Sequence, residues 1–426
     1  MKKSSNKTLD NFTVSANEYG YILGKQDGTF PDFGVHSAGE MLGVWIHPIK
    51  LLDGFWMQVN GELLRAENFT IFPYADQFDY SIPGTGINAE RLDFMPEGKK
   101  GAVITYTFIN DSMENVSLDA SFIARIHLFP VWLSDKKQIE DGHDHAKILE
   151  GGIIAAWDEK NPWYCAISSQ SADEAAILPG TPSPDNNKGD GVTCALNFTI
   201  SIQAGSTMEK QFFIAGSYTD EKDALEQLAA IKENHAPLLE QKKKTAQKIE
   251  ENSKLTTDYP DFDEMVSWVK QNTTWLDQRV EGIGRGLAAG VPEYAWWFGC
   301  DNSYSIQGCL VSGMISLAKD TALLLKNLSE QENGNGRIIH EITTYGAVYN
   351  RGNTQEAAHY IVMVYKIFMW TGDLAFLKEV YDYCKKAIDW LFSKMNGENL
   401  CPAGAGIIEI EGLDVKMIDS AVYTCK

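Results

Sequence analysis

The apolar pattern of this chain changes once along its length, and that change limits the possible folds more than any other feature. From about residue 11 to 217, short runs alternate apolar and polar residues between Gly, Asn, Asp and Pro; residues 55–61, 102–109 and 116–126 are examples. Period-two alternation bounded by turn residues is typical of half-buried strands. Many such strands with no helix between them predict a large antiparallel β-sandwich over residues 1–219.

A different composition begins near residue 220 and lasts to about residue 257. Leu225, Leu228 and Ile231 recur at helical spacing, Pro237 interrupts the helix, and a charged amphipathic segment follows from 238 to 254. Because proline lacks the backbone donor that a helix interior needs, the segment predicts two packed linker helices. The basic run at 242–244 is flanked by glutamates, which favours a solvated helix face.

The third part, residues 258–426, carries helical patterns only. Helices are expected at about 261–280, 302–316, 321–332, 353–370 and 374–394, with a last one opening near 413. The connections after 316 and 370 are short, whereas those after 280, 332 and 394 are long. This alternation is typical of repeated helical hairpins, whose long loops gather at one end. About six helices of this kind predict the N-terminal half of an α/α barrel.

The long loops hold the residues that suggest chemistry. The first ends in Tyr294-Ala-Trp-Trp-Phe-Gly-Cys-Asp301, where flat rings beside a carboxylate suit the faces and hydroxyls of a sugar. The alternative is that these aromatics are core and that Asp301 caps a helix. The second and third loops, which include 334–342, 350–356 and 404–414, also bring carboxylates or amides to helix starts. Three such loops at one end favour a binding site over capping alone.

These motifs resemble the six-hairpin, or (α/α)6-barrel, glycosidases of the glucosidase and glycogen-debranching group, which carry an N-terminal β-sandwich. Trp297-Phe-Gly-Cys-Asp301 is similar to the family's Trp-Phe-Gly-Arg-Asp. The runs 336–341 (Gly-Arg-Ile-Ile-His-Glu), 352–356 (Gly-Asn-Thr-Gln-Glu) and 370–373 (Trp-Thr-Gly-Asp) match as well. The motifs are fairly specific to the superfamily, and they do not specify one substrate.

Two departures from the family pattern matter. Cys300 stands where the resemblance implies an arginine, so one donor to sugar hydroxyls is missing. A closed barrel would also need about twice as many helices, and the sequence stops at 420–426 within a helical pattern, with no Gly or Pro stop. The sequence is therefore expected to represent a C-terminally truncated barrel, whose exposed half could favour self-association.

The resemblance implies roles for individual residues. Inverting glycosidases place two carboxyl groups about 6.5–9.5 Å apart, and the acid must keep its proton near neutral pH. By similarity to a Glu-x-Gly-x-Asp pattern, Asp414 is the first choice for the general acid and Glu411 the second, although Asp414 could instead cap the last helix. The general base is expected beyond Lys426. The residues expected to bind substrate are Trp296, Trp297, Asp301, Arg337, His340, Glu341, Gln355 and Glu356.

The resemblance implies an inverting, exo-acting glycoside hydrolase of the α-glucosidase or debranching type that acts on oligosaccharides. Without the base expected beyond Lys426, this chain would be inactive or very weak. An inverting sugar phosphorylase shares the same architecture and remains an alternative. A non-catalytic carbohydrate-binding or vestigial protein is the third possibility, and Cys300 and the expected truncation favour it. Sugar and linkage stay open.

Composition narrows the partners. A formal net charge of −21 argues against binding nucleic acid or anionic membranes, because both need basic patches. Seven widely spaced cysteines do not resemble a disulfide framework or a zinc site, and no metal or cofactor is expected. Neither a signal peptide nor a long apolar span is evident. A cytoplasmic location is the default expectation, and a periplasmic or secreted one would require a signal peptide that has been removed.

Overall fold

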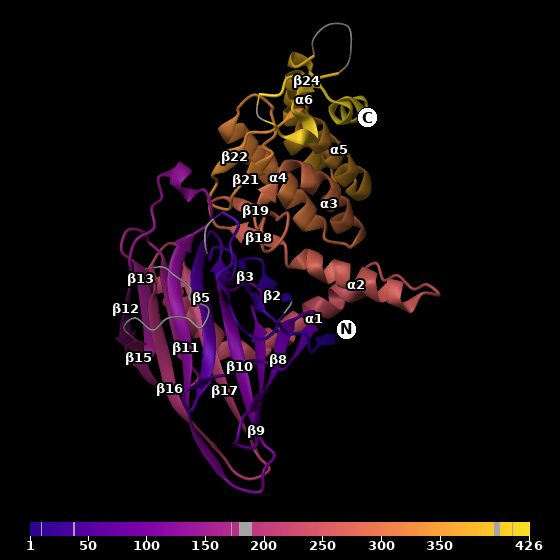
Figure 1. Cartoon of the computed structure of the whole chain (residues 1–426). Coiled ribbons are helices and arrows are strands. Elements are labelled where there is room, and N and C mark those ends of the chain that lie inside the picture. Colours follow the sequence, from indigo (N-terminus) through magenta and orange to yellow (C-terminus); the bar gives the residue numbers. More distant parts are fainter. Residues whose placement is uncertain (10, 37–38, 172, 179–189, 396–400, 411) are drawn as a thin grey trace. The chain divides into compact units, whose positions relative to one another are not determined.

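The computed structural model describes residues 1–426 except 10, 37–38, 172, 179–189, 396–400 and 411. It divides into two compact units, 1–248 and 249–426, with the division inside the helix α1, Glu221–Glu251. Figure 1 shows strands in the first unit and mostly helices in the second. No helix among the described residues is long and apolar enough to cross a membrane.

Two antiparallel sheets form most of the first unit. Over the described residues, one sheet has the order β1 (Lys3–Ser5), β7 (Asn68–Phe72), β8 (Ala75–Ile82), β9 (Ile87–Phe94), β10 (Gly101–Asn110), β17 (Thr207–Ser217), β14 (Tyr164–Ser169), β13 (Ile153–Asp158), β12 (Asp144–Leu149). The other runs β15 (Glu174–Leu178), β16 (Val192–Ile202), β11 (Val116–Pro130), β5 (Ile49–Val59), β4 (Gly43–Ile46), β3 (Gly20–Lys25), β2 (Phe12–Asn17), with β6 (Glu62–Leu63) paired to β5. A short 3₁₀ helix, Ser134–Lys137, follows β11.

The inner faces of the two sheets meet through aromatic side chains. Phe122 of β11 stacks on Phe212 of β17, with ring centroids 4.1 Å apart. The guanidinium of Arg91, on β9, lies 5.0 Å from the ring centroid of Phe55 on β5. Sheets that bury alternating residues against each other in this way make a β-sandwich, so the predicted sandwich is confirmed.

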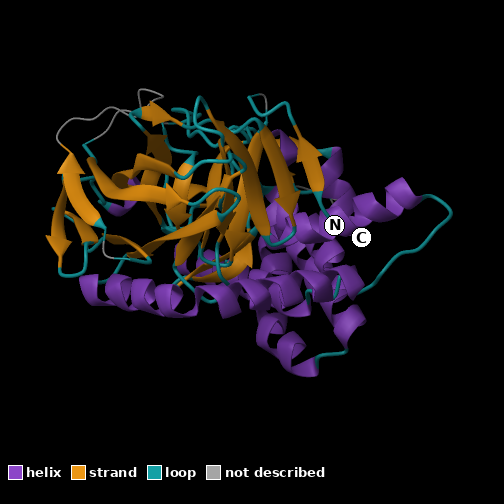
Figure 2. Cartoon of the chain, turned by 90° about the horizontal axis from the view of Figure 1, so that it is seen from below, coloured by secondary structure: helices purple, strands orange, loops and turns teal. Residues whose placement is uncertain are grey.

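The helix α1 lies along one sheet of the sandwich (Figure 2). Its Leu228, Ile231 and Leu238 pack against Phe94, Val103 and Phe213 in one core cluster. The sequence predicts two helices interrupted by Pro237, and in the structure two helical segments meet across a kink at Asn234, whose backbone is not helical. The kink lies three residues before Pro237 because proline disturbs the turn that precedes it.

The expectation that Lys242 is solvated is wrong. Its side chain is buried, and its ammonium group donates hydrogen bonds to the carbonyl oxygens of Ala16 at 2.5 Å and Met95 at 2.6 Å. Lys243, its neighbour in sequence, is partly exposed and pairs with Glu240. The glutamates around the basic run indicated a solvated face, but one of its lysines, Lys242, faces the sandwich.

The second unit is built from helical hairpins. Its helices are α2 (Pro260–Thr274), α3 (Gly299–Val311), α4 (Ile315–Glu332), α5 (Thr354–Thr371), α6 (Leu374–Ser393) and α7 (Ile418–Cys425). Its short strands are β18 (Asp277–Val280), β19 (Gly284–Leu287), β20 (Trp297–Phe298), β21 (Glu341–Ile342), β22 (Val348–Asn350), β23 (Ala403–Gly404) and β24 (Val415–Lys416), with a 3₁₀ helix at Gly406–Ile408. The six α-helices among the described residues of this unit match the predicted number.

Local chemistry explains the ends of these helices. An asparagine–glutamate capping box at Asn353 and Glu356 begins α5, and Gly372 ends it in the left-handed conformation. The carboxylate of Asp373 then caps α6 by accepting from the backbone N–H groups of Ala375 and Phe376. The connection between α5 and α6 is therefore short, and α5 packs against α3, α6 and α7 around a shared apolar core.

Three predicted boundaries in this unit are wrong. The short connection expected at 317–320 lies inside α4, since α3 ends at Val311 and α4 begins at Ile315. The helix expected at 261–280 ends at Thr274, because the chain turns at Gly282 and pairs Asp277–Val280 with Gly284–Leu287 as a hairpin. The helix expected from 413 begins at Ile418, after the strand Val415–Lys416, and Met417 is its N-cap residue. Asp414 therefore does not cap that helix, so the capping alternative for this residue is excluded.

Candidate functional site

Short strand pairings bring the first two long loops together. Trp297 and Phe298 of β20 pair with Ile342 and Glu341 of β21, and β21 pairs in turn with β22. The backbone N–H of Gly299 donates to the carbonyl oxygen of His340 at 2.8 Å. The start of α3 is therefore fixed beside the segment that leads into α5.

Glu356 lies at the centre of this arrangement and is fully buried. Its Oε2 accepts from the backbone N–H of Asn353 at 2.5 Å, and its Oε1 accepts from the Gln355 side-chain amide at 2.8 Å. The Nδ1 atom of His340 lies 2.6 Å from the same Oε1. A buried carboxylate needs such partners, since an unpaired buried charge is costly.

His340 extends from Glu356 to the third long loop. Its Nε2 atom lies 3.0 Å from Oε1 of Glu409, which follows the 3₁₀ helix Gly406–Ile408. The backbone of Glu409 is left-handed, with φ of 62°, and its side chain remains 40% exposed. The edge of the imidazole faces the ring of Phe298, with centroids 5.5 Å apart. One histidine thus joins all three loops.

Burial and neighbouring charges shift the pKa values of both His340 and Glu409. Burial disfavours the imidazolium, but the hydrogen bond and charge of Glu356, with the charges of Glu409 and Glu341, outweigh it and raise the pKa of His340. The pKa of Glu409 is raised mainly by burial, while His340 lowers it and Glu356 and Asp301 raise it. Both groups therefore hold protons to a higher pH than they would in water.

Cys300 reports the charge around the site. Burial, with the charges of Glu356, Asp301, Glu409 and Asp419, raises the pKa of its thiol to about 12. Asp301 is exposed in the first turn of α3, next to this thiol. The start of α3 therefore faces several carboxylates where the family pattern implies an arginine.

The aromatic residues divide between the core and the surface. Trp297 is fully buried, and its indole N–H donates to the carbonyl oxygen of Gly286. Trp296 is also buried, and its indole N–H donates to Oε1 of Glu341 at 2.8 Å. Tyr294, which was not predicted as a site residue, is 44% exposed and packs edge-on against Trp296 and Phe298. The exposed ring of this loop is therefore the tyrosine.

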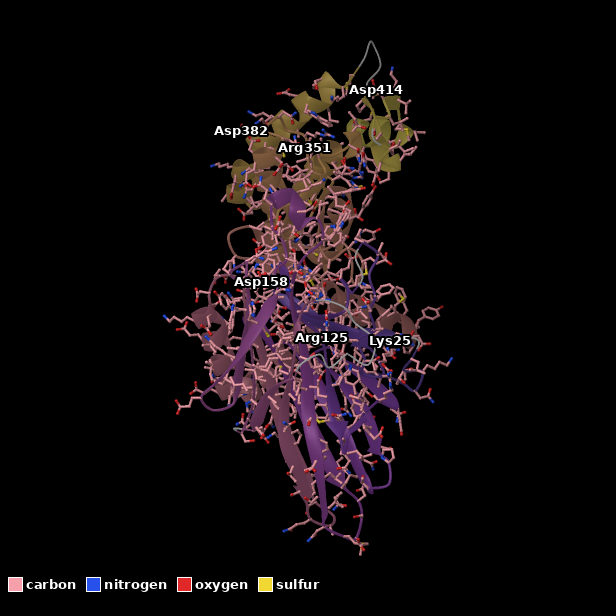
Figure 3. The ribbon with its side chains drawn as sticks, turned by 60° about the vertical axis from the view of Figure 1, so that its left-hand side comes forward. Lys25, Arg125, Asp158, Arg351, Asp382 and Asp414 are labelled. Atoms are coloured by element: carbon pink, nitrogen blue, oxygen red, sulfur yellow. The ribbon has the colours of Figure 1, made fainter. Side chains whose placement is uncertain are left out.

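Other predicted site residues lie in different surroundings. The guanidinium of Arg337 donates to the carbonyl oxygen of Gly352, at 2.7 Å from Nε, and lies over the ring of Trp390. Asp414 is exposed just before β24 (Figure 3), and Glu411 lies outside the described residues. His340, Glu341, Gln355 and Glu356 are buried around the three loops, whereas Asp301 and Asp414 are exposed.

Glu409 is the residue that the sequence analysis missed. Three carboxylates stand close together in the run from Glu409 to Asp414, and similarity to a family pattern pointed to the other two. The residue in the left-handed conformation is Glu409 itself, and no glycine or asparagine at that position predicts the turn from the sequence. Within the described residues, no group of three or more His, Cys, Asp or Glu side chains is arranged to hold a metal ion.

The fold of this chain, an antiparallel sandwich followed by helical hairpins, is that of the six-hairpin glycosidases with an N-terminal β-sandwich, so the predicted fold is confirmed. No protein-family model matches the sequence, and no curated protein matches it closely enough to count as a relative. The fold is therefore recognised from solved structures.

Two solved structures illustrate the likeness. One is described as a kojibiose phosphorylase from the human microbiome; it aligns with a TM-score of 0.62 and 12% identity over 92% of this chain and 59% of that one. The other is a bacterial glucoamylase in complex with acarbose, with a TM-score of 0.54 and 12% identity over 93% of this chain and 62% of that one. The chain thus spans less than two thirds of the length of either protein.

Proposed function

We propose that this chain acts on O-glycosidic bonds of oligosaccharides as an inverting, exo-acting glycoside hydrolase of the α-glucosidase or debranching type. The observation that supports the proposal most is the meeting of the second and third long loops at Glu356, His340 and Glu409, with Phe298 of the first loop against the His340 ring. Paired carboxyl groups with different surroundings are what glycosidic bond cleavage requires, since one must hold a proton and another must remain ionised. A glucoamylase shares the fold.

The proposed roles follow from exposure and contacts. Asp301, exposed in the first turn of α3, is suited to accept hydrogen bonds from sugar hydroxyls, and Glu341 would do so from beside Trp296. Asp414 and Glu411, in the third loop, are the carboxyl groups proposed from the sequence to protonate the leaving oxygen. Tyr294 offers an exposed ring on which a sugar face could stack.

The remaining predicted residues would support the site from behind. Trp297 packs under the first loop, Arg337 ties the second loop to Gly352, and Gln355 holds Glu356. A substitution in any of them would displace the residues that meet the sugar. Displacements of about 1 Å can cost about 100-fold in rate, so these residues matter to the proposed reaction without touching the substrate.

An inverting sugar phosphorylase is the second proposal. The observation in its favour is that the kojibiose phosphorylase aligns with the higher TM-score, 0.62 against 0.54 for the glucoamylase. In such a reaction inorganic phosphate attacks the anomeric carbon in place of water, and a sugar phosphate is released. The proton donated to the leaving oxygen is needed in both reactions.

The decisive experiment offers the chain aryl α-glucosides, maltose-type oligosaccharides and kojibiose, each with and without inorganic phosphate. Release of free sugar independent of phosphate is the expected result and supports the hydrolase. Release of a sugar phosphate only when phosphate is present would support the phosphorylase instead. Sugar binding by calorimetry without turnover under either condition would favour a carbohydrate-binding protein over both enzymes for this chain.

A further inference from the structure

From the contacts of His340, we infer that Glu356, His340 and Glu409 form one proton-sharing relay in which His340 positions Glu409 to donate a proton to the glycosidic oxygen. The inference rests on the proposed function, and it adds an acid that neither the family pattern nor the sequence analysis assigned. His340 is a positioning residue in this scheme, and Glu409 is the group that meets the substrate.

The inner end of the relay is fixed by the fold. Glu356 is fully buried in the first turn of α5, where the Asn353 backbone N–H and the Gln355 amide hold its two oxygens. All of these partners are donors, so Glu356 is held as an acceptor. It must therefore receive the Nδ1–H of His340 across their 2.6 Å contact, which sets the orientation of the ring.

The middle of the relay cannot turn away from its partners. His340 is only 3% exposed and its ring lies nearly perpendicular to that of Phe298, while its backbone carbonyl accepts from the N–H of Gly299. With Nδ1 committed to Glu356, Nε2 lies 3.0 Å from Oε1 of Glu409, close enough for an ion pair. The imidazole thus links the buried carboxylate of Glu356 to the partly exposed carboxyl group of Glu409.

The outer end of the relay is open. Glu409 sits at the end of the 3₁₀ helix in a left-handed conformation, which is uncommon for a residue with a long side chain. Such conformations persist only where the surroundings enforce them, and they cluster at functional sites. One oxygen of Glu409 faces His340 and the side chain is 40% exposed, so its other oxygen is available to a substrate.

The charges around the relay suit an acid. Glu356, Glu341 and Glu409 face His340, and together they raise its pKa, so the ring is positively charged over a wider pH range. Burial, with the charges of Glu356 and Asp301, outweighs the opposing effect of His340 and raises the pKa of Glu409. The relay can therefore exist with His340 as imidazolium, Glu356 as carboxylate and Glu409 as carboxylic acid.

The proton transfer then balances without any further component. The proton leaves the free oxygen of Glu409 and bonds to the glycosidic oxygen, which takes the electron pair of the breaking carbon–oxygen bond. Glu409 becomes a carboxylate that accepts the Nε2–H bond of the imidazolium. Water adds to the anomeric carbon and releases a proton, and Glu409 regains one from solvent. Stabilising the carboxylate that forms is the contribution of His340.

The first experiment does not depend on turnover. In protein labelled with ¹⁵N at histidine, the ring nitrogens of His340 are followed against pH in the wild type, Glu409→Gln and Glu356→Gln. His340 should titrate above the ordinary histidine range, and each variant should move its titration to lower pH. His359 is the matched control, because it lies in the same unit and burial lowers its pKa to about 4. A His340 titration midpoint that is the same in Glu409→Gln as in the wild type would overturn the relay.

The second experiment reads the pH dependence of activity. Glu409→Gln should lower kcat by about 10²–10⁴-fold, the usual contribution of a general acid. His340→Gln keeps a donor but loses the charge, so it should lower kcat and move the basic limb of the profile to higher pH. His359→Gln should leave the profile in place.

The two experiments together separate the relay from the proposed function. If Asp414→Asn abolishes turnover while Glu409→Gln keeps the wild-type profile, the relay is overturned and the hydrolase stands. If the titrations are coupled but no glycoside is turned over by the wild type, the shared proton is supported and the proposed function is overturned. A purely structural role for His340 predicts lost stability with an unmoved basic limb.

Discussion

The hydrogen bonds on Glu356 predict a large loss of stability when this side chain is removed. In Glu356→Ala the capping box that begins α5 is lost, which costs about 1 kcal/mol. The contact with His340 is also lost, and hydrogen bonds to charged groups contribute about 1.5–3 kcal/mol each. Because the donors left behind stay buried, we expect the free energy of unfolding of the helical unit to fall by about 3–5 kcal/mol.

Two companion variants divide this loss into its parts. Glu356→Gln keeps one oxygen but turns an NH₂ group towards donors, so we expect a loss of about 1.5–3 kcal/mol. Glu330→Ala is the matched control, because Glu330 pairs with Lys386 on the surface and is 46% exposed. Exposed ion pairs contribute about 0–1 kcal/mol, so the control should change little.

The assay must report on the helical unit alone, since the chain contains two compact units. Native-state hydrogen exchange at the amides of residues 354–358, measured against denaturant, gives the opening free energy of the first turns of α5. Fluorescence from the tryptophans of both units would mix the two transitions. A loss below about 1 kcal/mol in Glu356→Ala would show that Glu356 is not the buried acceptor described above.

Three further predictions concern other buried or capping groups. Lys242→Ala should destabilise the β unit by about 2–3 kcal/mol in denaturant titrations, because it leaves two backbone carbonyls unpaired, whereas Lys243→Ala should be nearly neutral. Burial disfavours the charge on His127, but Asp141 and Asp53 raise its pKa to about 9. The protonated ring should therefore stabilise the fold fully below pH 6.5, and this stabilisation should be lost towards pH 9. Melting temperatures measured against pH should show the loss, and His127→Gln should remove this pH dependence. Asp373→Ala should cost about 1 kcal/mol by removing the cap of α6, as exchange at Ala375 and Phe376 would report.

The sequence predicted the parts of the fold that repeat a local rule. The strand alternation and the helical-hairpin pattern each recur many times in the sequence, so one irregular segment does not change the prediction. Gly372 and Asp373 together end one helix and begin the next, and both acts follow from residue chemistry alone. The structure therefore follows the sequence closely wherever the deciding interactions lie within a few residues.

The features that sequence reasoning missed depend on distant partners. Asp277–Val280 forms a strand rather than the last turn of a helix because β19 pairs with it. Lys242 is buried because carbonyls at Ala16 and Met95, far away in the chain, receive its hydrogen bonds. Glu409 became prominent only when the third loop placed it against His340. Spacing along the chain contains none of these distances.

Cys300 explains why the positive charge beside Glu356 and Glu409 must come from His340. Its thiol is buried at the start of α3 among the carboxylates of Glu356, Asp301 and Glu409, and a neutral thiol offsets none of their charge. An arginine at this position, as the family pattern implies, would supply a permanent cation. With cysteine there, the cation that touches both Glu356 and Glu409 is an imidazole, which can lose its proton. The charge of the site, and the acidity of Glu409 with it, therefore depends on pH in a way that an arginine would not allow.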